Sequence, residues 1–259
     1  MGFPYGFRVW LALIALLFSP LTNAVQCQVS SGPQRVALLE LYTSEGCSSC
    51  PPADRWLSSI AHQGLGPDRV VPLALHVDYW DYIGWKDRFA RPAFSARQRE
   101  QVQATGGRVV YTPQVMLNGR DFRAWRSDAL TQAVDEINRS PAGADIRLSL
   151  KPVEKDRIEI AVTASAKVAD RAALYVAVYQ NDLSSDVRAG ENSGSRLYHD
   201  YVVREWRGPI LLSAATTPWQ QAITLKPEWV AAKMGVVAFV QDTRNDEILQ
   251  VLRLPLCPG

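Results

Sequence analysis

Two cysteines three residues apart, Cys47 and Cys50, are the residues of this sequence whose types and spacing most directly suggest chemistry. They stand in LYTSEGCSSCPPADRW, where an apolar segment typical of a strand runs into the start of a predicted helix. A C-x-x-C pair suits three uses: a dithiol that exchanges disulfides, two thiolate ligands of a soft metal, or a disulfide that only braces a turn. Only the surrounding sequence can distinguish between these three uses of the pair.

The predicted position of the pair at a helix start favours redox chemistry. Unpaired N–H groups and the helix dipole stabilise a thiolate there, so we expect a lowered pKa for Cys47. Such a thiolate is both an attacking group and a leaving group in disulfide exchange. Cys50 lies one turn further on and is expected to be more sheltered. The sequence therefore predicts Cys47 as the nucleophile and Cys50 as the resolving thiol.

Other residues are candidates for contact with a partner. Thr112 and Pro113 open TPQVMLNGRDF, which is predicted to form a strand, an Asn-Gly turn and a return strand. A cis peptide bond before Pro113 would turn this backbone toward the cysteines. Trp80 and Trp85 are predicted either to line a groove for a peptide or small thiol, or simply to pack between a strand and a loop.

Copper binding is the main alternative, with Cys47, Cys50 and His76 as soft ligands. A single histidine in a strand is more commonly a hydrogen-bonded structural residue, and a structural zinc site would need a fourth ligand. The redox interpretation requires no cofactor.

Two acids close to the cysteine pair are predicted to be solvated: Glu45 in the loop, and Asp54 on the surface of the helix, where it complements the dipole.

Strands and helices alternate through the first half of the chain. Residues 36–43 and 69–80 are apolar and typical of strands buried on both faces. Residues 91–107 and 127–140 have the composition and spacing of helices. We therefore expect a mixed α/β domain over residues 25–140.

The rhythm changes after PAGAD, residues 141–145. The segments that follow are short, alternate between apolar and polar residues with a period of two, and are separated by turns. This pattern predicts an all-β, sandwich-like domain over residues 141–259.

The first 24 residues have the features of a secretory signal peptide. Arg8 precedes the apolar run VWLALIALLF, and the small residues Thr22 and Ala24 precede the expected cleavage point. The run is shorter than the roughly 20 residues that span a membrane. The sequence thus predicts a periplasmic or secreted protein without membrane attachment after cleavage.

Export places the four cysteines in an oxidising compartment, where disulfides persist. Four cysteines allow three pairings, and the simplest joins Cys27 to Cys257 and Cys47 to Cys50. The formal net charge of the chain is only +2, with basic residues spread along its length, so nucleic acid is not an expected partner.

Four segments together resemble one known family: LYTSEGCSSCPPAD, LALHVDYWDYIGWKDRFARPAFSARQR, YTPQVMLNGR and GENSGSRLYHDYVVR. They look like the exported bacterial proteins catalogued as domain of unknown function 1223, and residues 36–140 resemble the thioredoxin fold. The resemblance implies an α/β thioredoxin-like domain followed by the all-β domain. It also implies Cys47 as nucleophile, Cys50 as resolving thiol and Pro113 as a cis-proline. Ser-Ser replaces the usual Gly-Pro between the cysteines and no Trp precedes Cys47, which leaves the direction of electron flow open.

We therefore expect an exported thiol–disulfide oxidoreductase that acts on exported proteins or on small thiols and disulfides. The alternative is a non-catalytic binding module, such as a periplasmic copper carrier.

Overall fold

The computed structural model describes residues 1–2, 27–213 and 216–257. The predicted signal peptide, residues 1–24, falls almost wholly outside this part of the chain. The described residues form fourteen strands and three α-helices. None of these helices is long and apolar enough to cross a membrane.

The largest element is a mixed sheet of eight strands. Its strands are, in spatial order, β14 (Ile248–Pro255), β13 (Met234–Asp242), β8 (Ala172–Gln180), β11 (Val202–Leu211), β3 (Val70–His76), β2 (Ala37–Thr43), β4 (Gln114–Leu117) and β5 (Arg120–Asp121). β3 runs parallel to both β2 and β11, and the other neighbours are antiparallel. The sheet therefore contains strands from both halves of the sequence.

The predicted fold class, an α/β thioredoxin-like domain followed by a separate β-sandwich, is wrong. β11 pairs directly with β3, where Val202 lies opposite Ala74 and the Ala74 N–H donates to the carbonyl of Tyr201 at 2.9 Å. The described part of the protein is mostly β. Its largest sheet contains strands from both halves of the sequence. Apolar periodicity identifies the strands but carries no information on which distant strand each one pairs with.

A second sheet of four strands packs against the first. Its order is β1 (Cys27–Ser30), β6 (Ala144–Glu154), β7 (Arg157–Ala166) and β12 (Thr217–Thr224). Leu148 and Val162 from this sheet share a buried core with Val176 and Val236 from the large sheet. The neighbouring residue on β8, Ala177, belongs to a different core, so β8 is covered on both faces.

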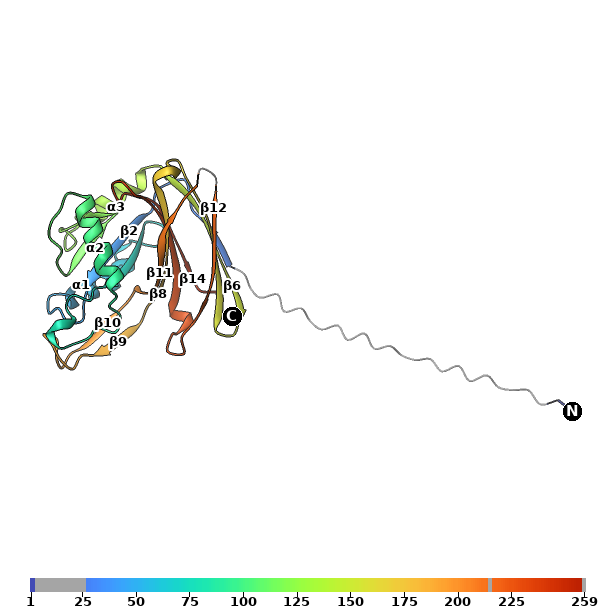
Figure 1. Cartoon of the computed structure of the whole chain (residues 1–259), viewed down its shortest axis with the longest axis horizontal. Helices are drawn as coiled ribbons and strands as arrows, with labels where there is room; N and C mark the ends of the chain where they lie inside the picture. Colours follow the sequence, from blue (N-terminus) through green and yellow to red (C-terminus); the bar gives the residue numbers. More distant parts are fainter. Residues whose placement is uncertain (3–26, 214–215, 258–259) are drawn as a thin grey trace.

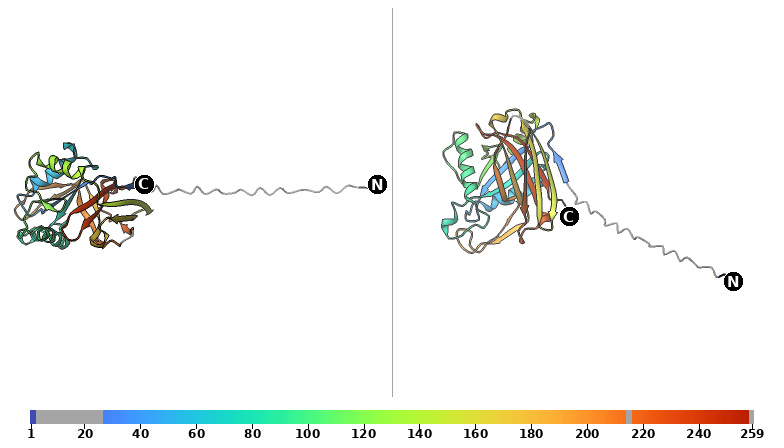
Figure 2. Two further views of the ribbon diagram at one scale, coloured as in Figure 1. Left: turned by 90° about the horizontal axis from the view of Figure 1, so that it is seen from above. Right: turned by 45° about the vertical axis from the view of Figure 1, so that its right-hand side comes forward.

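The helices are α1 (Pro51–Ser59), α2 (Pro92–Ala104) and α3 (Ala129–Arg139). In Figure 1 they gather on the left, β6 and β12 lie on the right, and β8, β11 and β14 run between them. Figure 2 shows the same layers from two further directions. Leu57, Phe94 and Val134, one from each helix, share the other core with Leu41 and Leu73. The large sheet thus separates two apolar cores.

A buried ion pair holds α2 against β2. Arg97 donates through Nε to Glu40 Oε1 at 2.6 Å, and Gln101 donates to Glu40 Oε2 at 2.7 Å. The guanidinium also lies 4.9 Å from the ring centroids of Tyr175 and Trp206, which belong to β8 and β11. This arrangement couples the first half of the chain to the second.

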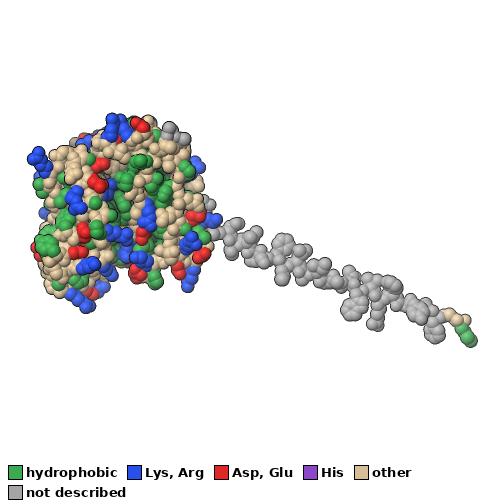
Figure 3. All heavy atoms as spheres, in the orientation of Figure 1, with side chains coloured by type: hydrophobic (Ala, Val, Ile, Leu, Met, Phe, Trp, Pro, Cys, Tyr) green, Lys and Arg blue, Asp and Glu red, His purple; other side chains and the backbone are tan. Residues whose placement is uncertain are grey.

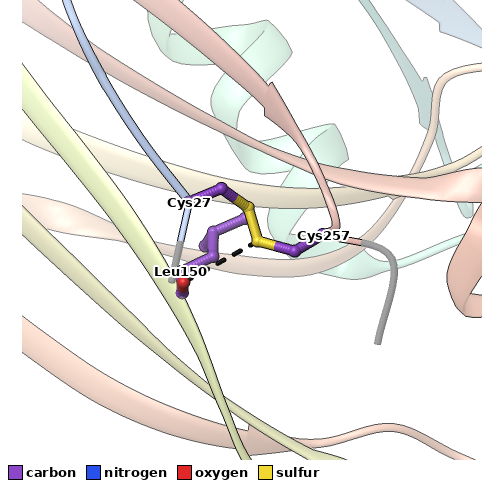
Figure 4. The surroundings of a disulfide bond; sticks show 3 residues. All are labelled: Cys27, Leu150 and Cys257. Carbon is purple, nitrogen blue, oxygen red and sulfur yellow. Dashed lines mark hydrogen bonds between the residues drawn. A yellow bond between two sulfur atoms is a disulfide. The ribbon is translucent and has the colours of Figure 1, made fainter. Parts of the chain in front are cut away.

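Figure 4 shows the disulfide that joins Cys27 of β1 to Cys257, beside Leu150 of β6. The Cα atoms of the two cysteines are 6.1 Å apart, and they are separated by 230 residues in sequence. The predicted pairing of Cys27 with Cys257 is therefore present. Cys47 and Cys50 carry free thiols, so the structure represents the reduced form of that pair.

The remaining two strands, β9 (Leu183–Asp186) and β10 (Arg196–His199), form a separate hairpin. Figure 1 shows it below α1. Its connecting loop, residues 187–195, is called the β9–β10 loop below. The position of this hairpin matters for the site because it brings residues of the second half of the chain to the cysteines.

Candidate functional site

The cysteine pair occupies the connection between β2 and α1. Cys50 is the N-cap residue of α1, and the helix begins with Pro51 and Pro52, whose missing N–H groups cost nothing in the first turn. Cys47 lies in the preceding turn, where its carbonyl accepts a hydrogen bond from the Cys50 N–H at 3.2 Å. The sequence therefore located the pair correctly at a helix start, but it is Cys50 that stands at the cap.

The sulfur of Cys47 contacts two oxygen atoms. Its Sγ lies 3.2 Å from Ser49 Oγ and 3.8 Å from the carbonyl oxygen of Thr112. The hydrogen bond from the Cys50 thiol is the main factor that lowers the pKa of Cys47, to about 6, against the effect of burial; the Ser49 hydroxyl assists. Cys47 therefore ionises more readily than free cysteine, whose pKa is about 8.5.

Cys50 has the opposite character. It is fully buried, and this burial raises its pKa well above the ordinary value, with further contributions from Cys47 and from the charge of Asp54. Near neutral pH the pair thus consists of one thiolate and one thiol. This is the division into an attacking and a resolving sulfur that disulfide exchange uses.

Thr112 and Pro113 face the cysteines from the opposite side. The peptide bond between them is cis, as predicted for Pro113. The Thr112 carbonyl accepts from Ser49 Oγ at 3.4 Å, and its hydroxyl accepts from Trp80 Nε1 at 2.6 Å. Trp80 thus positions Thr112. The predicted role of Trp80 in lining a groove remains a prediction.

Two acids predicted to be solvated are buried. Glu45 is 0% exposed and Asp54 is 5% exposed. Glu45 accepts from Trp85 Nε1 at 2.8 Å, and its other oxygen lies 3.2 Å from His199 Nε2; His199 Nδ1 is 3.7 Å from Asp54. Burial raises the pKa of Glu45, but the hydrogen bonds with His199 and Ser185 and the charge of His76 together outweigh it, and the net shift is downward. Burial raises the pKa of Asp54.

His76 forms a buried pair with Asp87. Its Nδ1 lies 2.6 Å from Asp87 Oδ2, which also accepts from the Glu45 N–H at 2.9 Å. Burial lowers the pKa of His76, but the Asp87 carboxylate outweighs this and raises it to about 8. In the described part of the chain, no group of three or more His, Cys, Asp and Glu side chains is arranged to hold a metal ion. The hydrogen bond that the structure gives His76 is thus the one with Asp87.

The β9–β10 loop supplies contacts to the cysteine loop whose individual partners the sequence left open. Asn192 is buried, and its Nδ2 donates to the carbonyls of Glu45 at 2.8 Å and Cys47 at 3.0 Å. Glu191 accepts from the Ser48 N–H at 2.9 Å. The only signal was the polar segment GENSGSRLYHD, whose contacts are invisible in sequence. The cysteine loop is thus clamped by the second half of the chain.

The close packing of the loop that carries Cys47 explains why residue 46 is a glycine. A Cβ on Gly46 would lie 3.2 Å from both Trp80 Cβ and Ile83 Cδ1 and 3.3 Å from the Trp80 carbonyl oxygen. Contacts this short require the neighbouring backbone to give way, so a side chain at this position would disturb the loop. Glycine between Glu45 and Cys47 allows the segment that contains Trp80 to approach.

Two solved structures are among those to which this chain is similar. A crystal structure of a protein from Agrobacterium tumefaciens is 27% identical, with a TM-score of 0.59 over 88% of this chain and 98% of that one. HBP35 of Porphyromonas gingivalis is 15% identical, with a TM-score of 0.66 over 87% of this chain and 76% of that one. The second likeness concerns the fold alone.

Sequence comparison gives the family. No curated protein matches the chain. The model of the family described as "Protein of unknown function (DUF1223)" matches residues 38–241, which include the cysteine pair, Thr112 and Pro113, and the β9–β10 loop. This chain therefore belongs to the DUF1223 family.

Proposed function

We propose that this protein is an exported thiol–disulfide oxidoreductase in which Cys47 attacks a partner disulfide and Cys50 resolves the mixed disulfide. The observation that carries the proposal is the unequal pair at the start of α1. Both cysteines are buried, but hydrogen bonds lower the pKa of Cys47 whereas burial raises the pKa of Cys50. A thiolate beside a protected thiol can react in two ordered steps.

In the first step the Cys47 thiolate attacks one sulfur of the partner disulfide. The partner S–S bond breaks, its other sulfur leaves as a thiolate and takes a proton, and Cys47 is joined to the partner. In the second step Cys50 loses its proton and attacks Cys47 Sγ. The Cys47–Cys50 disulfide forms, the partner leaves with its second thiol, and two electrons have passed to the partner. The reverse sequence oxidises a dithiol partner.

Access to Cys47 requires a local movement. Cys47 is only 1% exposed. Ser49, whose hydroxyl contacts the Cys47 sulfur, is exposed. Rotation of the Ser49 side chain therefore removes one cover without any change in the core. A partner bound through Cys47 would then lie against Thr112, whose carbonyl is 3.8 Å from the sulfur.

Two observations support export. The sequence of residues 1–24 has the features of a signal peptide. The Cys27–Cys257 disulfide also suits an oxidising compartment, where such bonds persist. The proposed partners are accordingly exported proteins or small-molecule thiols and disulfides of the periplasm or the extracellular space.

Equilibration with glutathione redox buffers tests the proposal. The reduced protein is incubated over a range of ratios of reduced to oxidised glutathione, and the remaining thiols are counted by alkylation and mass spectrometry. We expect a single reversible transition of two electrons that is abolished in Cys47→Ser and Cys50→Ser. The Cys27→Ser/Cys257→Ser double variant is the matched control and should keep the transition. A Cys47–Cys50 pair that stays reduced, or stays oxidised, across the whole range would contradict exchange.

A further inference from the structure

A surface groove lies next to the cis-proline segment. It has a volume of about 380 Å³ and is lined by Val109, Tyr111, Arg123 and Trp125. Tyr111 immediately precedes Thr112, whose carbonyl oxygen contacts both Cys47 Sγ and Ser49 Oγ. One lining residue of the groove is therefore the direct neighbour in sequence of the residue that contacts the reactive sulfur.

The walls of the groove are apolar and well supported. Val109 is 68% exposed, so its apolar side chain is open to a ligand. Trp125 is buried and packs against Trp56 of α1, with their ring centroids 4.9 Å apart. Tyr111 is fixed by the hydrogen bond from its hydroxyl to Asp121 at 2.7 Å. The groove thus offers an apolar surface on a rigid support.

The edges of the groove are basic. The guanidinium of Arg123 lies 5.6 Å from the centroid of the Tyr111 ring, and that of Arg126 lies 4.6 Å from the centroid of the Trp125 ring. Arg108, which precedes Val109, is also exposed. Asp121 pairs with Arg123 at 3.0 Å and offsets one of these charges. On the face drawn in Figure 3, basic and acidic side chains are interspersed.

We propose that this groove binds an extended segment of an oxidised polypeptide, with an apolar or aromatic side chain beside the reactive cysteine and a carboxylate near it. The inference rests on the proposed function, because it names the substrate class of the Cys47–Cys50 site. An extended chain advances about 3.3 Å per residue, so a side chain one or two residues from a cysteine bound at Cys47 reaches the groove. Its carboxylate would then face the arginines.

A small disulfide such as oxidised glutathione fits this surface less well. It has no apolar side chain to bury between Val109 and Trp125, and it can engage the sulfurs without filling the groove. The groove therefore provides selectivity for polypeptides, while reaction with small disulfides depends on the cysteines alone. This difference allows disulfide exchange by the cysteines and polypeptide binding in the groove to be tested independently.

The test uses two synthetic peptides, each with one cysteine activated as a mixed disulfide with nitrothiobenzoate. One carries Phe two residues from the cysteine and Glu beside it, and the other carries Gly and Lys at those positions. Oxidation of the reduced protein by each peptide is followed by nitrothiobenzoate release. The small, neutral, non-aromatic bis(2-hydroxyethyl) disulfide, with oxidation followed by mass spectrometry, is the reference. We expect the Phe/Glu peptide to react about tenfold faster, which corresponds to one or two modest contacts.

Variants of the groove residues test whether the preference for the Phe/Glu peptide arises in the groove. Val109→Asn and Arg123→Glu should reduce the preference to about twofold or less, without changing the rate with the neutral bis(2-hydroxyethyl) disulfide. Val153→Asn is the matched control, because Val153 is also an exposed valine but lies on β6 of the other sheet. A preference that survives both groove variants, or no preference at all, would overturn the docking proposal while leaving Cys47 chemistry intact.

A binding measurement keeps the inference testable if the cysteines prove unreactive. The Phe/Glu peptide is made with Ser in place of Cys and a fluorescent label, and its affinity is measured by anisotropy. Binding that is weakened by Val109→Asn and Arg123→Glu but not by Val153→Asn supports the groove. Equal affinity of all three variants and the parent contradicts it.

Discussion

The side-chain amide of Asn192 donates a hydrogen bond to the carbonyl of Cys47 at 3.0 Å, although 145 residues separate them. The same amide donates to the carbonyl of Glu45 at 2.8 Å. One buried side chain of the β9–β10 loop therefore satisfies two carbonyls on either side of Gly46. Unpaired carbonyls in a buried turn are costly, so this contact fixes the shape of the cysteine loop.

Replacement of Asn192 by Ala should destabilise the protein. The Glu45 carbonyl loses its side-chain donor and the Cys47 carbonyl keeps only the Cys50 N–H, so we expect the free energy of unfolding to fall by about 1–3 kcal/mol. Urea denaturation followed by tryptophan fluorescence measures the change. Glu191→Gln is the control, because an exposed amide oxygen can still accept from the Ser48 N–H, and its unfolding midpoint should match the parent. Equal midpoints for Asn192→Ala and the parent would argue against the clamp.

The reactivity of Cys47 should depend on pH with a midpoint near 6. Its pKa is lowered to about 6, so the thiolate persists above that pH and declines about tenfold per pH unit below it. Alkylation by iodoacetamide between pH 4.5 and 9, with each cysteine quantified by mass spectrometry, gives the profile. Cys50 should remain unmodified over this range, because burial raises its pKa.

The variant Ser49→Ala tests the cause of the shift. The Ser49 hydroxyl lies 3.2 Å from Cys47 Sγ and helps to lower its pKa, so its removal should move the midpoint upward. A parent midpoint near 8.5, the ordinary value for cysteine, would contradict the assignment of Cys47 as the thiolate.

The Glu40–Arg97 pair should be important for stability. Replacing Glu40 by Gln leaves the buried Arg97 charge without its anion, and we expect a loss of about 3–5 kcal/mol. Denaturant titration provides the measurement. The double variant Glu40→Gln/Arg97→Met removes both charges and should recover part of the loss. If the double variant is no more stable than Glu40→Gln, the uncompensated charge is not the cause.

The Cys27–Cys257 disulfide should stabilise the fold without affecting exchange. It closes a loop of 230 residues, and loops of this size are worth roughly 4 kcal/mol or more in the chain-entropy model. The Cys27→Ser/Cys257→Ser variant should therefore unfold at lower temperature in calorimetry. Its Cys47 alkylation profile should match the parent. An unchanged melting temperature would show that the bond closes no entropically costly loop.

Local elements of this fold could be predicted from the sequence because their causes are local. The Asn118-Gly119 turn was predicted between two strands, and both residues adopt the positive φ angles that such turns require. A Cβ on Gly119 would also approach the carbonyl of Asp246 to 2.1 Å, so only glycine fits there. The double proline likewise marked the start of α1 correctly.

Long-range relations could not be predicted in this way. The period-two pattern after residue 145 predicted strands, but it did not show that Val176 and Ala177 of β8 are both buried, in different cores. The pairing of β11 with β3 depends on contacts between distant segments. Asp54 illustrates the same limit at the site: its place in the first helical turn suggested a surface acid, but the β9–β10 hairpin covers it and brings His199 to 3.7 Å.

The most direct test of the central claim is covalent trapping of oxidised glutathione. The reduced Cys50→Ser and Cys47→Ser variants are each mixed with oxidised glutathione, quenched with acid over time and analysed by mass spectrometry. The account predicts that a glutathione adduct accumulates on Cys47 in Cys50→Ser, that the parent proceeds to the Cys47–Cys50 disulfide, and that Cys47→Ser remains unmodified. An adduct that forms as fast on Cys50 in Cys47→Ser, or on neither cysteine, would contradict it.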